Sequence, residues 1–203
     1  MMGPVYVITS PDAPLPVADQ ARAAARGGAA LVQIRDKRAT DAELIALINT
    51  LLPEMRALGV GLIVNDRLAV ALATHADGLH VGQSDGDIRT ICQRILPGMI
   101  LGLSIETVAQ ARHIPARVDY IGAGPVRATA TKPDHATPTG FDGLARITAT
   151  ATRPAYAIGG LRQGDAAATR AAGAVGMALV SAVTHAPDPE SATRAMLAEW
   201  RAA

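Results

Sequence analysis

Eight short apolar runs, separated by longer Ala-rich amphipathic stretches, constrain the fold of this chain more than any other feature. Most runs are apolar at nearly every position, which is typical of strands that are buried on both faces of a parallel sheet. The predicted strands are Val5–Thr9, Ala30–Arg35, Gly61–Asn65, Gly78–Val81, Ile100–Ser104, Tyr120–Ala123, Ala155–Ile158 and Gly176–Val180. The predicted helices are Leu15–Arg26, Asp41–Leu58, Arg67–Thr74, Asp87–Leu96, Thr107–Ile114, Gly140–Thr150, Gly164–Ala172 and Pro189–Ala202.

This alternation of strands and helices predicts an α/β protein with a single-domain (β/α)8 barrel, a TIM barrel, over residues 1–203. The length of 203 residues is small for this architecture, for which roughly 250 is typical, so the loops must be short. An open doubly wound sheet is the alternative. Such a sheet would more often carry a Gly-rich turn after the first strand, where this chain has Ser10-Pro11-Asp12.

Composition excludes several classes of partner. Lys plus Arg is 19 and Asp plus Glu is 18, so net charge gives no reason to expect nucleic acid or an anionic membrane. Aromatic residues make up only 2% of the chain, which predicts a core of Ala, Val, Leu and Ile and no base-stacking surface. The single cysteine, Cys92, fits a reducing cytoplasm, and no apolar run approaches the roughly 20 residues that span a bilayer. We therefore expect a cytoplasmic protein without membrane or nucleic-acid partners, and the sequence leaves open whether it forms a homo-oligomer.

Charged residues follow the second predicted strand with the spacing of a strand. In an extended chain, Gln33, Arg35 and Lys37 share one face, while Ile34 and Asp36 lie on the other. Function sits at the carboxyl ends of the strands in such barrels. Two cations and an amide that converge there predict an anion receptor, because arginine supplies a bidentate fork and lysine a point charge. The alternative is a solvated strand end.

Carboxylates follow the next two strands. Asn65 and Asp66 end the third strand, and Asp85 follows the fourth. Because Mg2+ is held by one or two carboxylates together with substrate phosphates, Asp66 and Asp85 are the predicted metal ligands. The alternative is that Asp66 and Asp87 cap helices, which is the role expected of Asp87.

The remaining strand ends carry features of phosphate sites. Ser104 ends the fifth strand, and the longest loop, Gly124 to Thr139, follows the sixth. Gly160 after the seventh strand and Ser181 after the eighth match the common phosphate site of these barrels, where backbone N–H groups and a helix N-terminus hold the anion. A cationic site and an uncharged cradle together predict two phosphorylated small-molecule substrates. No Ser/His/Asp or Cys/His arrangement is evident, and His80, inside a strand, is expected to be structural.

The motifs at these strand ends resemble, in order and over nearly the whole chain, those of the thiamine-phosphate synthase family. They are Val32-Gln33-Ile34-Arg35-Asp36-Lys37, Val64-Asn65-Asp66-Arg67, Ala76-Asp77-Gly78-Leu79-His80-Val81-Gly82-Gln83-Ser84-Asp85, Gly102-Leu103-Ser104, Asp119-Tyr120-Ile121-Gly122-Ala123-Gly124-Pro125-Val126, Thr129-Ala130-Thr131-Lys132, Ala157-Ile158-Gly159-Gly160 and Val180-Ser181.

The resemblance implies the substrates and the residue roles. The enzymes of this family join 4-amino-2-methyl-5-(diphosphooxymethyl)pyrimidine to 4-methyl-5-(2-phosphooxyethyl)thiazole, or its carboxylated form, and release diphosphate with the help of Mg2+. Carried over by motif, the pyrimidine diphosphate is held by Gln33, Ile34, Arg35, Asp36, Lys37, Asn65, Ser104 and Lys132, and the thiazole phosphate by Thr129, Ala130, Thr131, Gly160, Val180 and Ser181. The resemblance assigns catalysis to Arg35, Lys37, Ser104 and Lys132. It assigns Mg2+ binding to Asp66 and Asp85.

This chain departs from the family at two places. Glu106 stands where the family commonly has His, and Val126-Arg127-Ala128 is more polar than the usual apolar-aromatic stretch. Two other functions remain as alternatives, a thiazole tautomerase built on the same barrel and a phosphate-binding regulatory barrel without activity. Neither would need the Asp66/Asp85 pair together with the Gln33, Arg35 and Lys37 set.

Overall fold

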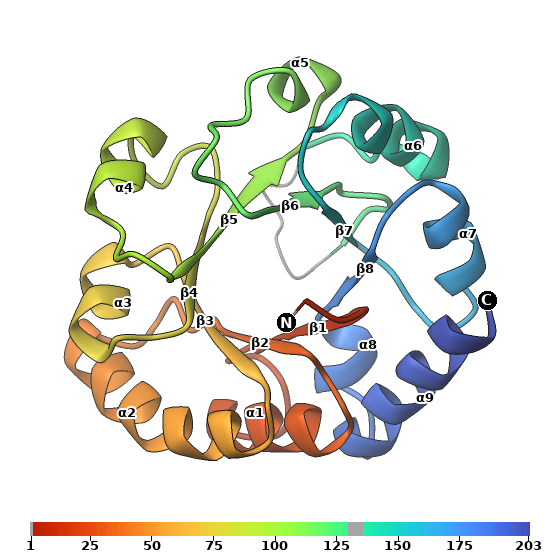
Figure 1. Ribbon diagram of the computed structural model, residues 1–203. Coiled ribbons are helices and arrows are strands. Elements are labelled where there is room, and N and C mark those ends of the chain that lie inside the picture. The colour runs from red at the N-terminus through yellow and green to blue at the C-terminus, as the bar shows by residue number, and fades with distance from the viewer. Residues whose placement is uncertain (1, 130–135) are drawn as a thin grey trace.

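The computed structural model describes residues 2–129 and 136–203 and has a closed barrel of parallel strands that follow one another in sequence order (Figure 1). The strands are β1 (Val5–Ile8), β2 (Leu31–Ile34), β3 (Gly61–Asn65), β4 (Gly78–Val81), β5 (Ile100–Ile105), β6 (Tyr120–Ala123), β7 (Ala155–Ile158) and β8 (Gly176–Leu179). Pairing of β1 with β8, where Val5 faces Met177, closes the barrel. The predicted TIM barrel is therefore confirmed, and the open sheet is excluded.

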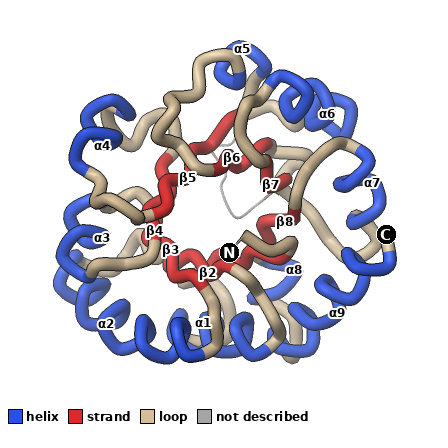
Figure 2. The backbone as a smooth tube through the Cα atoms, in the orientation of Figure 1, coloured by secondary structure: helices blue, strands red, loops and turns tan. Residues whose placement is uncertain are grey.

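The helices form a ring outside the strands, as the tube in Figure 2 shows. They are α1 (Val17–Arg26), α2 (Asp41–Ala57), α3 (Leu68–Thr74), α4 (Ile88–Arg94), α5 (Val108–Ala111), α6 (Gly140–Thr150), α7 (Ala166–Ala171), α8 (Ser181–Thr184) and α9 (Pro189–Ala202). Local signals fix some of their starts. Thr40 and Glu43 form a reciprocal capping box at α2, and Asp87 accepts the N–H groups of Arg89 and Thr90 at α4.

Aliphatic residues fill the space between the strands and the helix ring, but the barrel interior is different. The chain has three tyrosines, and all of them, Tyr6, Tyr120 and Tyr156, pack edge to face inside the barrel with ring centroids 5.4–5.8 Å apart. The prediction of a core built only from aliphatic residues is wrong for this inner layer. Glycine makes the room, since a Cβ on Gly102 would lie 2.2 Å from Cζ of Tyr120.

Within residues 2–129 and 136–203, none of the helices combines the length and the apolar character that crossing a bilayer demands.

Candidate functional site

A cavity of about 450 Å³ opens at the carboxyl ends of the strands, where the sequence predicts the site. The predicted residues that line it are Gln33, Arg35, Lys37, Asn65, Asp85, Ser104, Thr129, Gly160, Val180 and Ser181. Ile34, Asp36 and Asp66 do not line it. Ala130, Thr131 and Lys132 lie outside the described residues. The loops after β2, β3, β4, β5, β6, β7 and β8 thus bring residues from distant parts of the sequence to one cavity.

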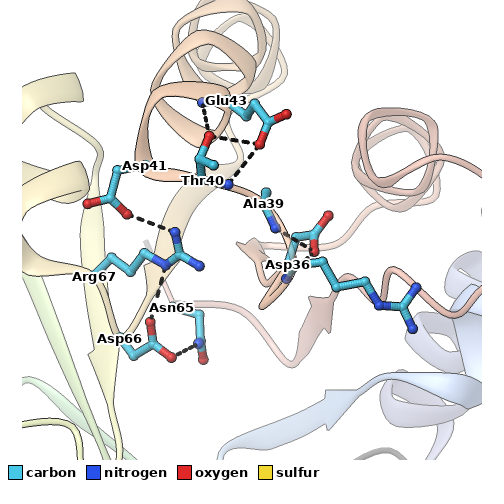
Figure 3. Close-up of polar contacts among 9 residues, drawn as sticks. Asp36, Ala39, Thr40, Asp41, Glu43, Asn65, Asp66 and Arg67 are labelled. Atoms are coloured by element: carbon cyan, nitrogen blue, oxygen red, sulfur yellow. Dashed lines mark hydrogen bonds and ion pairs between the residues drawn. The ribbon is translucent and has the colours of Figure 1, made fainter.

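The strand period sorts the residues that end β2 as predicted. Gln33, Arg35 and Lys37 face the cavity, whereas Ile34 is 1% exposed and packs in the aliphatic layer under the helices. Asp36 Oδ1 accepts the N–H groups of Arg38, at 2.9 Å, and of Ala39, so its side chain shapes the turn into α2 (Figure 3). Any contact of Ile34 or Asp36 with a substrate in the cavity would therefore involve the backbone.

The guanidinium of Arg35 is an uncompensated cation at the cavity wall. Thr9 holds the Arg35 backbone, because Thr9 Oγ1 accepts the Arg35 N–H at 2.9 Å. In the part of the chain that the structure describes, no carboxylate lies within ion-pair distance of this guanidinium. A positioned arginine without a carboxylate partner is suited to bind a phosphate or diphosphate group.

The carboxylate of Asp66, which is not among the residues that line the cavity, is held by its neighbours. Lys37 Nζ is 3.2 Å from its Oδ2. Figure 3 shows the other two contacts, in which Asn65 Nδ2 donates to the same oxygen at 2.7 Å and Arg67 Nε is 4.0 Å from Oδ1. The backbone of Asp66 is left-handed, with φ of 54°, and its N–H donates to the carbonyl of His80 at 2.8 Å. Asp66 is therefore tied to β4 and to Lys37 and Asn65, the cavity residues that follow β2 and end β3.

Asp85 offers the second carboxylate of the predicted metal pair. It lies at the cavity rim, is exposed, and its Oδ2 accepts the N–H of Gly82 at 2.7 Å. Asp87 instead caps α4, where hydrogen bonds from the Thr90 hydroxyl and from the Thr90 and Arg89 N–H groups lower the pKa of its carboxyl. Among residues 2–129 and 136–203, no three His, Cys, Asp or Glu side chains form a metal-binding group. Two hard oxygen donors fit Mg2+ bound together with a phosphorylated substrate, and they do not fit a metal held by protein alone.

The opposite wall of the cavity is an uncharged backbone turn after β7. Gly159 and Gly160 both have positive φ, 98° and 63°, and a Cβ on Gly160 would meet Cβ of Arg127 at 2.8 Å. Only glycine fits this turn, which leaves its backbone open to a ligand in the cavity. The sequence predicted this cradle from the position of Gly160 after the seventh strand.

Arg127, from the polar stretch that departs from the family pattern, clamps the turn. Its backbone N–H donates to the Gly159 carbonyl at 3.0 Å, and its Nη1 donates to the Gly160 carbonyl at 3.3 Å. The same guanidinium forms a bidentate pair with Asp165, with Nη2 donating to Oδ1 at 2.8 Å. Burial acts to raise the pKa of the Asp165 carboxyl, but the hydrogen bonds from Arg127 and from the Arg162 N–H hold the pKa below its usual value.

The sequence also missed a hydrogen-bond chain in the wall of the cavity, whose lining includes Tyr6 and His80 as well as Gln33 and Ser104. Gln33 Nε2 donates to Tyr6 Oη at 2.5 Å, and Tyr6 Oη is 2.8 Å from Tyr120 Oη. His80 continues the chain, with Nδ1 3.0 Å from Tyr120 Oη and Nε2 3.0 Å from Ser104 Oγ. The strand period indicates only that these side chains point into the barrel, because Tyr6, Gln33, His80, Ser104 and Tyr120 all occupy inward-facing positions of their strands, and it does not identify their partners.

Fold and site together define a class of protein: a TIM-barrel enzyme whose candidate site for small molecules lies at the carboxyl ends of its strands. The family model for thiamine monophosphate synthase matches residues 5–183. The thiamine-phosphate synthase of Roseiflexus sp. (strain RS-1) is 47% identical over 197 residues, which are 96% of this chain and 84% of that protein. The thiamine-phosphate synthase of Vibrio parahaemolyticus is 40% identical, over 95% of this chain and 96% of that protein. The chain belongs to the thiamine monophosphate synthase family, whose members are transferases.

Solved structures agree with this assignment. Thiamine phosphate pyrophosphorylase from Pyrococcus furiosus superposes with a TM-score of 0.89 and 32% identity, covering 98% of this chain and 96% of that chain. A 3-hexulose-6-phosphate synthase also superposes, with a TM-score of 0.73, but at 15% identity it shares the fold alone.

Proposed function

We propose that this chain joins 4-amino-2-methyl-5-(diphosphooxymethyl)pyrimidine to 4-methyl-5-(2-phosphooxyethyl)thiazole, or its carboxylated form, giving thiamine phosphate and diphosphate, with release of carbon dioxide as well when the carboxylated form is used. The observation that carries the proposal is the pairing, in one cavity of about 450 Å³, of a cationic wall after β2 with an uncharged glycine turn after β7. A diphosphate needs the first, and a monophosphate is suited to the second.

The pyrimidine diphosphate lies against the cationic wall. Arg35 and Lys37 face its phosphates, with Gln33, Asn65 and Ser104 around them. Lys132, which lies outside the described residues, is a further ligand of the diphosphate by the family motif. The absence of a carboxylate partner for Arg35 among the described residues supports this assignment, because its charge is available to the ligand.

The thiazole phosphate binds at the opposite wall. Gly160 exposes its backbone there, and Val180 and Ser181, where α8 begins, line the same part of the cavity. By the family motif, Thr129, Ala130 and Thr131 are further ligands of this phosphate. Thr129 lines the cavity, and Ala130 and Thr131 lie outside the described residues. The clamp that Arg127 places on Gly159 and Gly160 supports this assignment, since a fixed turn presents its backbone groups in one geometry.

Asp66 and Asp85 are the residues that would hold Mg2+. Both donate hard carboxylate oxygens from neighbouring strand ends, which is the donor set that Mg2+ takes beside substrate phosphates. When bound, the metal would supply positive charge to the diphosphate oxygens as the bond between the methylene carbon and the diphosphate oxygen weakens.

The proposed reaction requires the protein to stabilise charge and to exclude water. The bond between the pyrimidine methylene carbon and the diphosphate oxygen breaks, and its electron pair leaves with diphosphate. The aminopyrimidine ring donates electrons to the methylene cation, and the thiazole nitrogen lone pair then forms the new C–N bond. Arg35, Lys37 and Lys132 stabilise the charge that grows on the leaving oxygens, so no protein nucleophile is required.

A coupling assay tests the proposal directly. The purified protein is mixed with both substrates, with and without Mg2+, and thiamine phosphate and diphosphate are quantified. We expect Mg2+-dependent formation of both products in equal amounts. If folded protein binds thiazole phosphate and forms neither product, the proposal is refuted in favour of a tautomerase or a regulatory barrel. The single cysteine supports a cytoplasmic location for this reaction.

A further inference from the structure

A hydrogen-bond chain joins Gln33 to Ser104, two cavity residues on opposite sides of the barrel, through the barrel interior. Its internal members are almost completely shielded from solvent: Tyr6 is 1% exposed, Tyr120 0% and His80 8%. Buried polar groups satisfy their hydrogen bonds with one another when water is excluded. The direction of one hydrogen bond in this series therefore determines the direction of the others.

The Gln33 amide sets the direction of the chain. Gln33 Nε2 donates to Tyr6 Oη, so the single hydroxyl hydrogen of Tyr6 is available for Tyr120 Oη. Tyr120, which accepts from Tyr6, then donates its own hydrogen to His80 Nδ1. Burial raises the pKa of both phenols above the usual value, so both keep the protons that this direction requires.

The direction determines which nitrogen of His80 carries the proton. An Nδ1 that accepts from Tyr120 has no hydrogen, so the neutral imidazole carries its proton on Nε2. Nε2–H then donates to Ser104 Oγ, 3.0 Å away. The hydroxyl hydrogen of Ser104 is left over, and among the described residues Ser104 Oγ has no second hydrogen-bond partner.

Strand register makes the central link possible. His80, Gly102 and Tyr120 lie side by side on β4, β5 and β6. Because Gly102 has no side chain, the His80 ring and the Tyr120 phenol meet across it, whereas a Cβ there would lie 2.4 Å from His80 Nδ1. Ser104 stands two residues further along β5 on the same face, within reach of His80 Nε2.

We propose that His80, in its Nε2–H tautomer, is a positioning residue that makes the Ser104 hydroxyl a hydrogen-bond donor directed at the substrate. Resting on the proposed function, this means that Ser104 recognises a lone pair of the pyrimidine diphosphate, a ring nitrogen or a phosphate oxygen. Gln33 and Ser104 are then coupled across the barrel. If the Gln33 carbonyl faced Tyr6 instead, every bond would reverse and Ser104 would donate to His80.

Nuclear magnetic resonance of protein carrying 15N-labelled histidine tests the tautomer without any substrate. The His80 signals are assigned by their loss in His80→Gln, and we expect the Nε2–H pattern. Tyr120→Phe removes one oxygen and keeps the ring packing, so the fixed tautomer should give way to a mixture. Tyr156→Phe is the matched control, because this buried phenol donates to the Gly3 carbonyl and takes no part in the hydrogen bonds that join Gln33 to Ser104. It should leave the His80 nitrogen signals unchanged.

Steady-state kinetics test the positioning role. For Tyr120→Phe we expect kcat/KM for the pyrimidine diphosphate to fall about tenfold, the worth of one lost hydrogen bond, with KM for the thiazole phosphate unchanged. His80→Gln keeps an N–H donor and should retain more of this kcat/KM than His80→Leu. In Ser104→Ala, the further change Tyr120→Phe should have little effect, because the group it positions is gone.

The two arms separate this inference from the proposed function. An Nδ1–H or doubly protonated His80 overturns the inference even if thiamine phosphate forms. Full additivity of Tyr120→Phe and Ser104→Ala in kcat/KM overturns the positioning role. A protein that forms no thiamine phosphate refutes the proposed function, while the Nε2–H pattern would still establish the direction of the chain.

Discussion

The carboxylate of Asp66 is held by Lys37, Asn65 and Arg67, so a cation that binds this carboxylate must compete with Lys37. We expect Asp66→Asn and Asp85→Asn each to raise the Mg2+ concentration for half-maximal activity by roughly tenfold or more, because each removes one anionic ligand and keeps its shape. Activity measured against Mg2+ concentration, with direct Mn2+ binding as a second readout, provides the test.

Asp87→Asn is the control for this pair. Asp87 lies two residues after Asp85 and is also exposed, but its carboxylate caps α4. Its loss should lower the melting temperature slightly and leave the Mg2+ dependence as in the parent protein. An unchanged Mg2+ dependence in Asp66→Asn or Asp85→Asn would remove that residue from the metal site.

Single residues also show which features of the site could be predicted from the sequence. Alternation along β2 is a local rule, and it correctly separated Gln33, Arg35 and Lys37 from Ile34 and Asp36. It gave no account of what the inward side chains meet across the barrel. The hydrogen bond between Tyr6 and Tyr120 joins residues 114 positions apart, and such a pairing follows from barrel closure and register and not from local pattern.

At the scale of elements, the Arg127–Asp165 pair joins the loop after β6 to the loop after β7. Arg127→Met removes the donor to the Gly160 carbonyl and leaves Asp165, which is 6% exposed, without its cation. We expect kcat/KM for the thiazole phosphate to fall by about tenfold to a hundredfold, because a displaced turn misplaces its ligand, with KM for the pyrimidine diphosphate unchanged. Unfolding should also become easier by roughly 1–3 kcal/mol, since a buried acceptor loses its partner.

Arg117→Met is the matched control at the other end of the barrel. Arg117 Nη1 pairs with Asp119 Oδ2 at 2.8 Å, and its side chain is 31% exposed, against 37% for Arg127. This variant should lose stability and keep both KM values. Equal effects of the two variants on the thiazole KM would show that the clamp acts only through stability.

The helices and strands were the features of this molecule that the sequence predicted best. The bounds of β3, β4, β6, β7, α6 and α9 agree with the prediction, and others differ by a few residues. The single-turn α8 was not among the predicted helices, although Ser181 was expected to start one. The Arg127–Asp165 clamp was not predictable, because its members are 38 positions apart with α6 and β7 between them, and only the barrel brings the two loops together.

At the scale of the whole molecule, all three tyrosines of the chain lie inside the closed barrel, so their ionisation reports on the barrel as a unit. Burial raises the pKa of Tyr156 to about 12 and raises those of Tyr6 and Tyr120 above their ordinary value of 10.0. In the unfolded chain all three ionise near 10.0, so unfolding releases protons above that pH. The stability that the neutral phenols confer is therefore complete below pH 10 and is lost as pH rises toward 12.

We expect the free energy of unfolding to fall above pH 10 with a slope that approaches about 4 kcal/mol per pH unit, since each of three tyrosines contributes about 1.4 kcal/mol per unit. Ultraviolet absorbance of tyrosinate and circular dichroism, followed together through an alkaline titration, provide the measurement. Both signals should change in one transition, because a tyrosine becomes able to ionise when the barrel opens. In Tyr156→Phe the slope should fall by about a third, as one of three protons is lost. Tyrosinate that forms near pH 10 while the circular dichroism stays native would mean that solvent enters the barrel interior. Ionisation of the phenols would then not be linked to unfolding, and they could not cause the predicted fall in stability above pH 10.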